Sequence, residues 1–208
     1  MPTENFSIGV AYRREVTIDH AAQANFVQIL TGNTVLDQAV AIALPGSQPA
    51  TVSFTYPGSI AAGAALRRGY WTIEVDFQWM LWSSFDAVTI NYVNSPAFDV
   101  VLPEDWQSTW RGAIGVEYLI RDDWEVRGGY GYDHSPAPSD TISPFIHDAD
   151  RHTFGLGGSW KYEKLRLDFN LRYVLFRDSA TLGISRYGYN GCFKSNSIQA
   201  GVSLGYRF

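Results

Sequence analysis

Apolar and polar side chains alternate with a period of two along most of the chain. From Ile198 to Phe208 every second residue is apolar, and small or polar residues such as Gly201 and Arg207 stand between them. A β-strand with one apolar and one polar face has this period, and a helix does not keep it. The last segment therefore predicts a strand over 197–208.

The same alternation recurs in earlier segments, and the connections between them are short and long in turn. Short polar connections occur at Arg13 to Glu15 and Arg121 to Asp123, whereas 94–107 and 134–150 are long. This order predicts an all-β, antiparallel, up-and-down fold within one domain, residues 1–208. The predicted strands, about nine in number, are 5–13, 15–27, 51–67, 70–92, 108–120, 123–133, 151–162, 164–177 and 197–208.

The two faces of these strands favour a transmembrane barrel over a soluble sandwich. Aromatic rings lie at the ends of the apolar stripes, with Tyr12, Trp71 and Tyr118 expected near the short turns and Trp79 and Trp110 toward the long loops. Such rings are typical of the two interfaces of a bilayer. Charged residues in the middle of the polar face suit a hydrated lumen better than a packed core. An antiparallel sheet with one solvated face is the alternative.

Composition excludes several classes of protein. With 46% hydrophobic and 18% charged residues the chain is expected to fold, and a net charge of −5 gives no basic footprint for nucleic acid. The single cysteine, Cys192, cannot form an intrachain disulfide, and no Cys/His spacing suits zinc. No apolar run is long enough for a transmembrane helix, but a barrel hides its hydrophobicity in alternate positions.

Four stretches, in this order and spacing, carry a resemblance to a known family: FSIGVAYRREVTIDHAAQAN from Phe6, WTIEVDFQWMLWSSF from Trp71, DWQSTWRGAIGVEYLIRDDWEVRGGYGYDHSPAP from Asp105 and IHDADRHTFGLG from Ile146. The chain resembles the C-terminal part of the FadL family of outer-membrane transporters for long-chain fatty acids and other hydrophobic compounds. The resemblance implies the bacterial outer membrane, its lipid bilayer, and a fatty acid, hydrocarbon or detergent-like ligand. It also implies recognition of Phe208 by the assembly machinery, and no cofactor.

The resemblance further implies what a complete barrel would contain. Members of the FadL family have fourteen strands and an N-terminal hatch inside the lumen. Nine strands with no hatch would be a partial barrel, because an odd number leaves the first and last strands parallel. The function implied is passive uptake of hydrophobic molecules; the alternative is a structural barrel fragment that transports nothing.

Charged residues on the polar face are the candidate ligand-binding residues. Arg111, Arg127 and Arg172, together with Phe176, form the predicted set in the lumen, where an arginine would bind the carboxylate of a fatty acid. The alternative is that these charges pair with one another and fill the lumen. Inward glycines such as Gly129 and Gly155 would leave clearance for a ligand or hatch, or allow the strands to curve.

Three weaker signals lie in the connections. Histidines and aspartates around 134–152 suggest a cation site or a solvated loop, without metal-ligand spacing. Asp133-His134-Ser135 contains the residue types of a hydrolase, but neighbouring strand residues point to opposite faces, so no enzyme is predicted. Apolar residues in loops 31–49 and 94–107 would form a collecting groove for ligand, or pack loop against loop; they are Val35, Leu36, Ile42, Leu44, Phe98, Val100, Val101 and Leu102.

Overall fold

The computed structural model describes residues 5–144, 146–181 and 183–208, and so leaves residues 1–4 of the predicted domain outside the description. Its larger elements in chain order are β1 (Phe6–Arg13), β2 (Val16–Ala24), α1 (Thr34–Ala43), β3 (Gln48–Tyr56), β4 (Ser59–Arg68), β5 (Trp71–Met80), β6 (Ala87–Tyr92), β7 (Val100–Pro103), β8 (Thr109–Arg121), β9 (Trp124–Asp133), β10 (Arg151–Tyr162), β11 (Leu165–Phe176) and β14 (Asn196–Tyr206). Two-residue strands β12 (Ser179–Ala180) and β13 (Cys192–Phe193) and 3-10 turns η1 (Trp82–Ser84) and η2 (Pro96–Phe98) complete the set.

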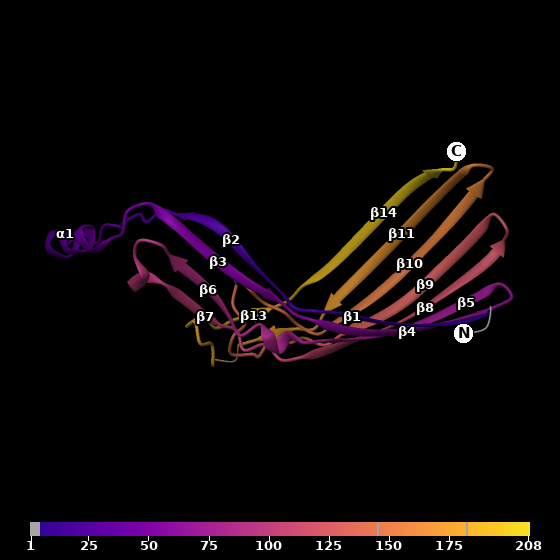
Figure 1. Cartoon of the computed structure of the whole chain (residues 1–208), viewed down its shortest axis with the longest axis horizontal. Helices are drawn as coiled ribbons and strands as arrows, with labels where there is room; N and C mark the ends of the chain where they lie inside the picture. Colours follow the sequence, from indigo (N-terminus) through magenta and orange to yellow (C-terminus); the bar gives the residue numbers. More distant parts are fainter. Residues whose placement is uncertain (1–4, 145, 182) are drawn as a thin grey trace.

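Eight strands form one curved antiparallel sheet in the order β1-β4-β5-β8-β9-β10-β11-β14 (Figure 1). Short turns join β4 to β5, β8 to β9 and β10 to β11 at one end, which we call the short-turn end; the longer connections lie at the other, the long-loop end. Among the described residues β1 pairs only with β4 and β14 only with β11, so the sheet is a partial barrel and is not closed.

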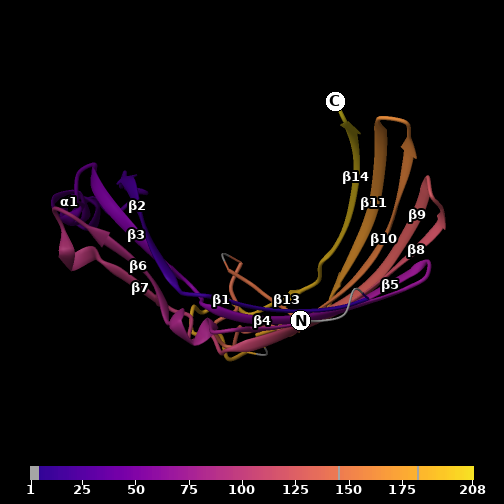
Figure 2. The same cartoon turned by 45° about the vertical axis from the view of Figure 1, so that its right-hand side comes forward.

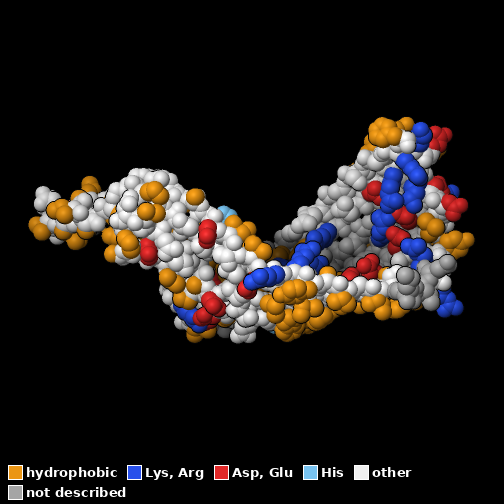
Figure 3. Space-filling model, viewed as in Figure 1, with side chains coloured by type: hydrophobic (Ala, Val, Ile, Leu, Met, Phe, Trp, Pro, Cys, Tyr) orange, Lys and Arg blue, Asp and Glu red, His pale blue; other side chains and the backbone are white. Residues whose placement is uncertain are grey.

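Side chains of opposite character occupy the two faces of this sheet. One cross-strand row on the outer face runs through Ile8, Ala64, Val75, Ile114, Tyr130, Phe154, Tyr173 and Ile198. The next row belongs to the inner face and contains Ser7, Ala65, Glu74, Gly115, Gly129, Gly155, Arg172 and Gln199. Figure 3 shows charged side chains in the hollow of the sheet and hydrophobic ones along its outside. The predicted alternation is confirmed in register across all eight strands.

A second sheet, β2-β3-β6-β7, extends beyond the long-loop end and is continuous with the first (Figure 2). The prediction of a hairpin at Arg13 to Glu15 is wrong, because β1 pairs with β4 and β2 pairs with β3. The chain therefore runs on through Arg14 and Glu15 into the second sheet, opposite Pro57 and Gly58. A Cβ atom at Gly58 would lie 2.9 Å from the carbonyl oxygen of Arg13, so the close approach of the two strands here requires glycine.

The joint between the two sheets, where Arg13 to Glu15 lie opposite Pro57 and Gly58, also changes the number of strands. Predicted strand 51–67 is interrupted at Pro57, which cannot donate to a ladder, and predicted strand 70–92 is interrupted by η1. The first sheet has eight strands rather than nine, so β1 and β14 run in opposite directions. The expectation of an odd number of strands, with the first and last parallel, is therefore wrong, although the sheet is open.

Aromatic side chains gather near both ends of the outer face. At the short-turn end the rings of Trp71 and Tyr118 lie 4.4 Å apart, centre to centre, and at the long-loop end Trp110 lies 5.3 Å from Tyr132. Tyr12, expected at the short turns, pairs with Ile60 toward the long loops instead, because β1 continues into β2. Aromatic rings are thus present near both ends of the outer face, and Tyr12 lies toward the long-loop end instead of the short-turn end.

No described helix is long and apolar enough to cross a membrane. Helix α1 has no buried residues and projects from the far end of the second sheet (Figure 1). Buried side chains outside the eight-stranded sheet include Phe85, Val88, Thr141, Ile142 and Thr181, which lie in β6 and in the connections. The inner face of the eight-stranded sheet consequently stays uncovered by the described residues.

Candidate functional site in the lumen

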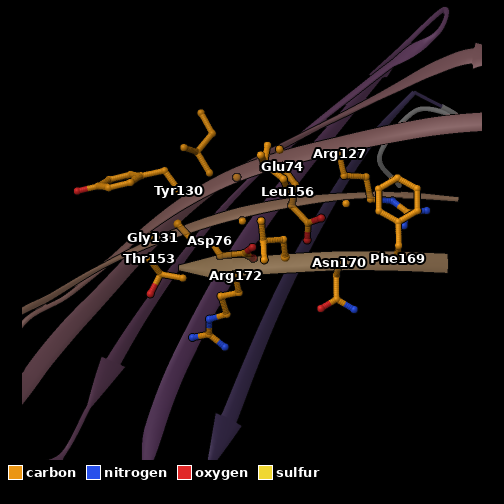
Figure 4. Close-up of a pocket in the computed structure, with 18 of the residues that line it drawn as sticks. Glu74, Asp76, Arg127, Tyr130, Gly131, Thr153, Leu156, Phe169, Asn170 and Arg172 are labelled. Atoms are coloured by element: carbon orange, nitrogen blue, oxygen red, sulfur yellow. The ribbon is translucent and has the colours of Figure 1, made fainter. Parts of the chain in front are cut away.

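A groove of about 590 Å³ lies across the inner face between β5 and β11 (Figure 4). Three of its residues, Gly115, Gly129 and Gly155, are cross-strand neighbours on β8, β9 and β10. Gly131 and Gly157 extend this bare strip along β9 and β10. Since glycine has no side chain, the backbone of the sheet itself forms the floor.

The floor glycines differ in what surrounds them. A Cβ atom at Gly115 or Gly155 would meet nothing within 4 Å and would project into the groove. At Gly129 it would lie 3.2 Å from the carbonyl oxygen of Ile114, and at Gly157 3.0 Å from that of Phe169. The floor is therefore bare for two reasons: open space above two of its glycines, and close strand contacts at two others.

A network of charged side chains lies on the inner face toward the short turns, and two of its members, Arg127 and Asp168, also line the groove. The Glu125 carboxylate, 7% exposed, accepts from Arg127, from Arg166 at 2.6 Å and from Lys161 at 3.2 Å. Arg166 also binds Asp168 at 2.9 Å. Neighbouring strands β9, β10 and β11 supply these side chains, so their register brings the charges together.

Arg127, one of the predicted ligand-binding residues, belongs to this network. Its Nε donates to Glu117 at 2.7 Å and its Nη2 donates to Glu125. Two of its five N–H donors thus bind carboxylates that balance its charge, so Arg127 attracts an anionic ligand less than an unpaired guanidinium does. In the structure, Arg127 follows the alternative prediction, because it pairs with other lumen charges.

Arg111 and Phe176 lie at the long-loop side of the groove, in a second cluster. Arg111 is 3.5 Å from the buried carboxylate of Asp133, which also lies 3.6 Å from Arg151. The guanidinium of Arg151 stands over the ring of Phe176, 5.9 Å from its centre. Arg111 lines the groove, whereas Phe176 is not among its lining residues.

Arg172 differs from the other two arginines. It lines the groove from β11, and within the described part of the chain its side chain has no hydrogen bond or ion pair. Figure 4 shows Arg172 pointing to the same side of the sheet as Thr153 and Asn170, and Tyr130 pointing to the other. Arg172 is thus an exposed cation beside a bare floor, with all its donors available.

Two groove residues were missed by the sequence reasoning. Glu74 and Asp76, both on β5, line the wall opposite Arg172. Their position at alternate residues of a strand already indicated the inner face. That they share a groove with Arg172 depends on the pairing of the strands between β5 and β11.

At the rim, Asp150 secures the connection between β9 and β10. Its carboxylate accepts from the Tyr132 hydroxyl and the Ser135 backbone N–H, each at 2.9 Å, and lies 2.8 Å from Nδ1 of His134. Partial burial opposes the charge, but these hydrogen bonds outweigh it and lower the pKa of Asp150 below its usual range. Asp148, more deeply buried, has a raised pKa despite Arg151 nearby.

Of the weaker candidates in the connections, His134 and Asp150 lie together, whereas the other histidines have different partners. His147 stacks on Phe193, and His152 binds the Tyr130 hydroxyl at 2.8 Å. In the described ranges no three His, Cys, Asp or Glu side chains could hold a metal together. No side-chain hydrogen bond joins His134 to Ser135 in the described part of the chain: His134 Nδ1 lies against Asp150, and Ser135 Oγ accepts from the backbone N–H of Ala137. The nucleophile–base contact of a hydrolase is therefore not made by these two residues.

The apolar loop residues divide between exposure and packing. Residues 34–43, expected within a loop, form helix α1, because the Asn33 side chain caps it by accepting from the backbone N–H groups of Val35 and Leu36. Val35 and Ile42 are exposed on this helix. Phe98 instead packs near Phe26, with ring centres 6.2 Å apart. Loop packing thus holds for Phe98 and does not hold for the helix.

Comparisons with known proteins agree with the fold and with the resemblance. The model of the family described as outer membrane protein transport protein (OMPP1/FadL/TodX) matches residues 1–208. A long-chain fatty acid transport protein of Salmonella typhi is 26% identical over 194 residues, covering 82% of this chain and 40% of that protein. Alkane uptake protein A of Marinobacter nauticus is 25% identical over 171 residues, covering 76% and 34%.

Solved structures share the architecture. A FadL homologue of Pseudomonas aeruginosa superimposes with a TM-score of 0.78 at 21% identity, covering 99% of this chain and 50% of that one. The toluene transporter TodX of Pseudomonas putida gives a TM-score of 0.61 at 18% identity, covering 99% and 46%. The chain therefore spans half or less of the length of these proteins.

Proposed function

The chain belongs to the outer membrane protein transport family (OMPP1/FadL/TodX), and from this we propose that it forms part of a passage for passive uptake of hydrophobic molecules across the bacterial outer membrane. The family consists of outer-membrane transport proteins and not of enzymes. Since the chain spans 40% of its Salmonella relative, its transport activity belongs to the proposal.

Long-chain fatty acids are the ligand class that we propose first. The observation that carries this choice is Arg172, an unpaired guanidinium beside a floor without side chains. A carboxylate would accept charge-assisted hydrogen bonds from Arg172, while the hydrocarbon chain would lie along the glycine floor. Neutral hydrocarbons would use the same floor without the arginine.

The bilayer and the assembly machinery are the proposed partners of the outer face. Its exposed apolar rows and aromatic ends suit lipid contact. Phe208, fully exposed beyond β14, is available for recognition by the assembly machinery.

A structural role without transport is the second candidate. The open edges of β1 and β14, each paired on one side within the described residues, favour it. In this case the eight strands would insert into the membrane with partners along those edges and would move no ligand.

Uptake by living cells separates the two candidates. The protein at its natural full length is expressed in cells whose own fatty acid transporter is deleted, and uptake of a labelled long-chain fatty acid and of an alkane is measured. We expect both above the empty-vector level, and a roughly tenfold loss of fatty acid uptake alone in Arg172→Gln. Arg68→Gln, at the short-turn end and outside the groove, is the matched control. Uptake at the empty-vector level by a surface-exposed protein would support the structural role.

A further inference from the structure

We propose that Glu74 and Asp76 make the lumen groove selective for ligands with a single negative charge, bound at Arg172, and reject molecules with a carboxylate at both ends. This inference rests on the proposed function and deepens it, because it assigns the ligand an orientation across the sheet. It comes from the placement of charge around the glycine floor.

The acidic and basic walls face each other along one cross-strand row. Glu74 pairs with Gly115, Gly115 with Gly129, Gly129 with Gly155, and Gly155 with Arg172. Four interstrand steps of about 4.8 Å place the two backbone positions roughly 19 Å apart along the curved sheet. No side chain stands between them in this row.

Asp76 adds a second negative charge to the same wall. Its row continues through Ala113 and Gly131, so its neighbours toward the groove are also small. Asp76 lines this groove and two smaller hollows beside it, of about 430 and 250 Å³, and its carboxylate reaches over Gly63 on β4. The β5 wall is therefore acidic on two successive inward positions.

Neither acid is neutralised by a described cation. Glu74 and Asp76 have no ion pair among the described residues, whereas Glu117, Glu125 and Asp168 all do. Arg111, which lines the hollow of about 250 Å³ together with Asp76, is instead 3.5 Å from Asp133. Among the residues that line the groove, the charges without an ion pair are thus an arginine on one wall and two carboxylates on the other.

This arrangement acts differently on three kinds of chain molecule. A monocarboxylate binds Arg172 and leaves a neutral methyl end near the acids. A dicarboxylate that binds Arg172 brings its second charge toward Glu74 and Asp76, where like charges repel it. A neutral alcohol of the same length gains nothing from Arg172 and loses nothing at the acids. At the strength of exposed charge pairs, repulsion from two acids amounts to roughly a fivefold loss for the dicarboxylate.

The test compares a monocarboxylate, an α,ω-dicarboxylate and a primary alcohol of equal chain length, each radiolabelled. Uptake by transporter-deleted cells is measured for the full-length protein, for the Glu74→Gln/Asp76→Asn double variant, and for Asp122→Asn/Glu163→Gln, which changes the net charge equally in two short turns. We expect the double variant at β5 to raise dicarboxylate uptake roughly fivefold and to leave monocarboxylate and alcohol uptake unchanged. The turn variant is expected to change none of the three.

Two results would overturn the inference, and they differ. If all ligands enter well above the empty-vector level but the dicarboxylate-to-monocarboxylate ratio is the same in wild type and the β5 variant, the selectivity is wrong and the proposed function stands. If no ligand enters with wild type, although heat-modifiable gel mobility shows the protein folded, the proposed function and the inference both fall.

Discussion

The charge network near the short turns and the groove beside it lie on the same inner face and follow the same alternating pattern, yet they differ in what the charges touch. In the network Glu125 meets three cations, and Arg127 meets two carboxylates. In the groove Arg172 and Glu74 are separated by three glycines of one row. In the network the charged side chains pair with one another, whereas in the groove Arg172 and Glu74 have no ion pair among the described residues and are available to a ligand.

The difference shows that charge in a lumen does not by itself indicate a binding site. A paired charge fixes neighbouring strands in register and holds the wall together, as in the network. A binding site requires an unpaired group together with room for the ligand. Arg127 and Arg172, which the pattern of the sequence treats alike, therefore receive different roles.

The largest effect is expected from breaking the network. Glu125→Gln removes the carboxylate that accepts from Arg127, Lys161 and Arg166. Because these cations are partly exposed, we expect a loss near the lower limit for buried pairs, about 3 kcal/mol in the free energy of unfolding. Urea unfolding of the protein in lipid vesicles measures it. Arg172→Gln is the control, with an expected change below about 0.5 kcal/mol; equal losses would contradict the division of roles.

Filling the groove should act on the ligand instead of the fold. A leucine at Gly155 would project into open space, since a Cβ atom there meets nothing within 4 Å. We expect Gly155→Leu to lower uptake of fatty acid and alkane alike by roughly tenfold, because lost ligand contact costs about 1.4 kcal/mol. Gly205→Leu, on the inner face of β14 but outside the groove, should leave uptake unchanged. Unimpaired uptake by Gly155→Leu would contradict the proposal that the ligand lies along the glycine floor.

Asp150, at the long-loop end just before β10, is expected to contribute less stability than Glu125, and its contribution depends on pH. Asp150 resembles Glu125 in accepting several donors, but it lies outside the membrane-spanning strands. Its folded pKa is lowered, so its contribution is complete above the unfolded pKa of an aspartate, about 3.9, and is lost as the pH falls through the folded value.

Asp150→Asn is therefore expected to destabilise the protein by about 1 kcal/mol at pH 7 and to differ little from wild type near pH 3. Urea midpoints at the two pH values measure the difference. A variant as stable as wild type at pH 7, or a difference that persists unchanged at pH 3, would contradict this role for the carboxylate.

Much of the fold could be predicted from local pattern. Alternation in 197–208 assigned the faces of β14, and the same holds for β8 to β11, because a residue's parity along a strand decides its face. The joint could not be found this way. Arg13-Arg14-Glu15 has the composition of a reverse turn, and only its alignment with Pro57-Gly58 on the neighbouring strand identifies it as a break in a continuing strand. Helix α1 did have a local signal, the Asn33 cap.

The residue types of the site could be predicted from the sequence, but whether each charged side chain has a partner could not. Arg111, Arg127 and Arg172 all have inward parity, so sequence reasoning could name them together. Whether each has a partner depends on register between strands: Arg127 lies opposite Glu117 on β8, whereas Arg172 lies opposite Gly155 on β10. That pairing is tertiary information, and no pattern within one strand contains it.

The glycine floor beside Arg172 is proposed to hold the ligand. A long-chain fatty acid with a diazirine in its hydrocarbon chain, irradiated with the full-length protein in outer membranes and followed by mass spectrometry, tests this directly. We predict cross-links to inner-face residues of β8 to β11 around Gly115, Gly129 and Gly155, and their loss in Gly155→Leu. Cross-links confined to outer-face residues such as Val126 and Leu171, unchanged in that variant, would contradict it.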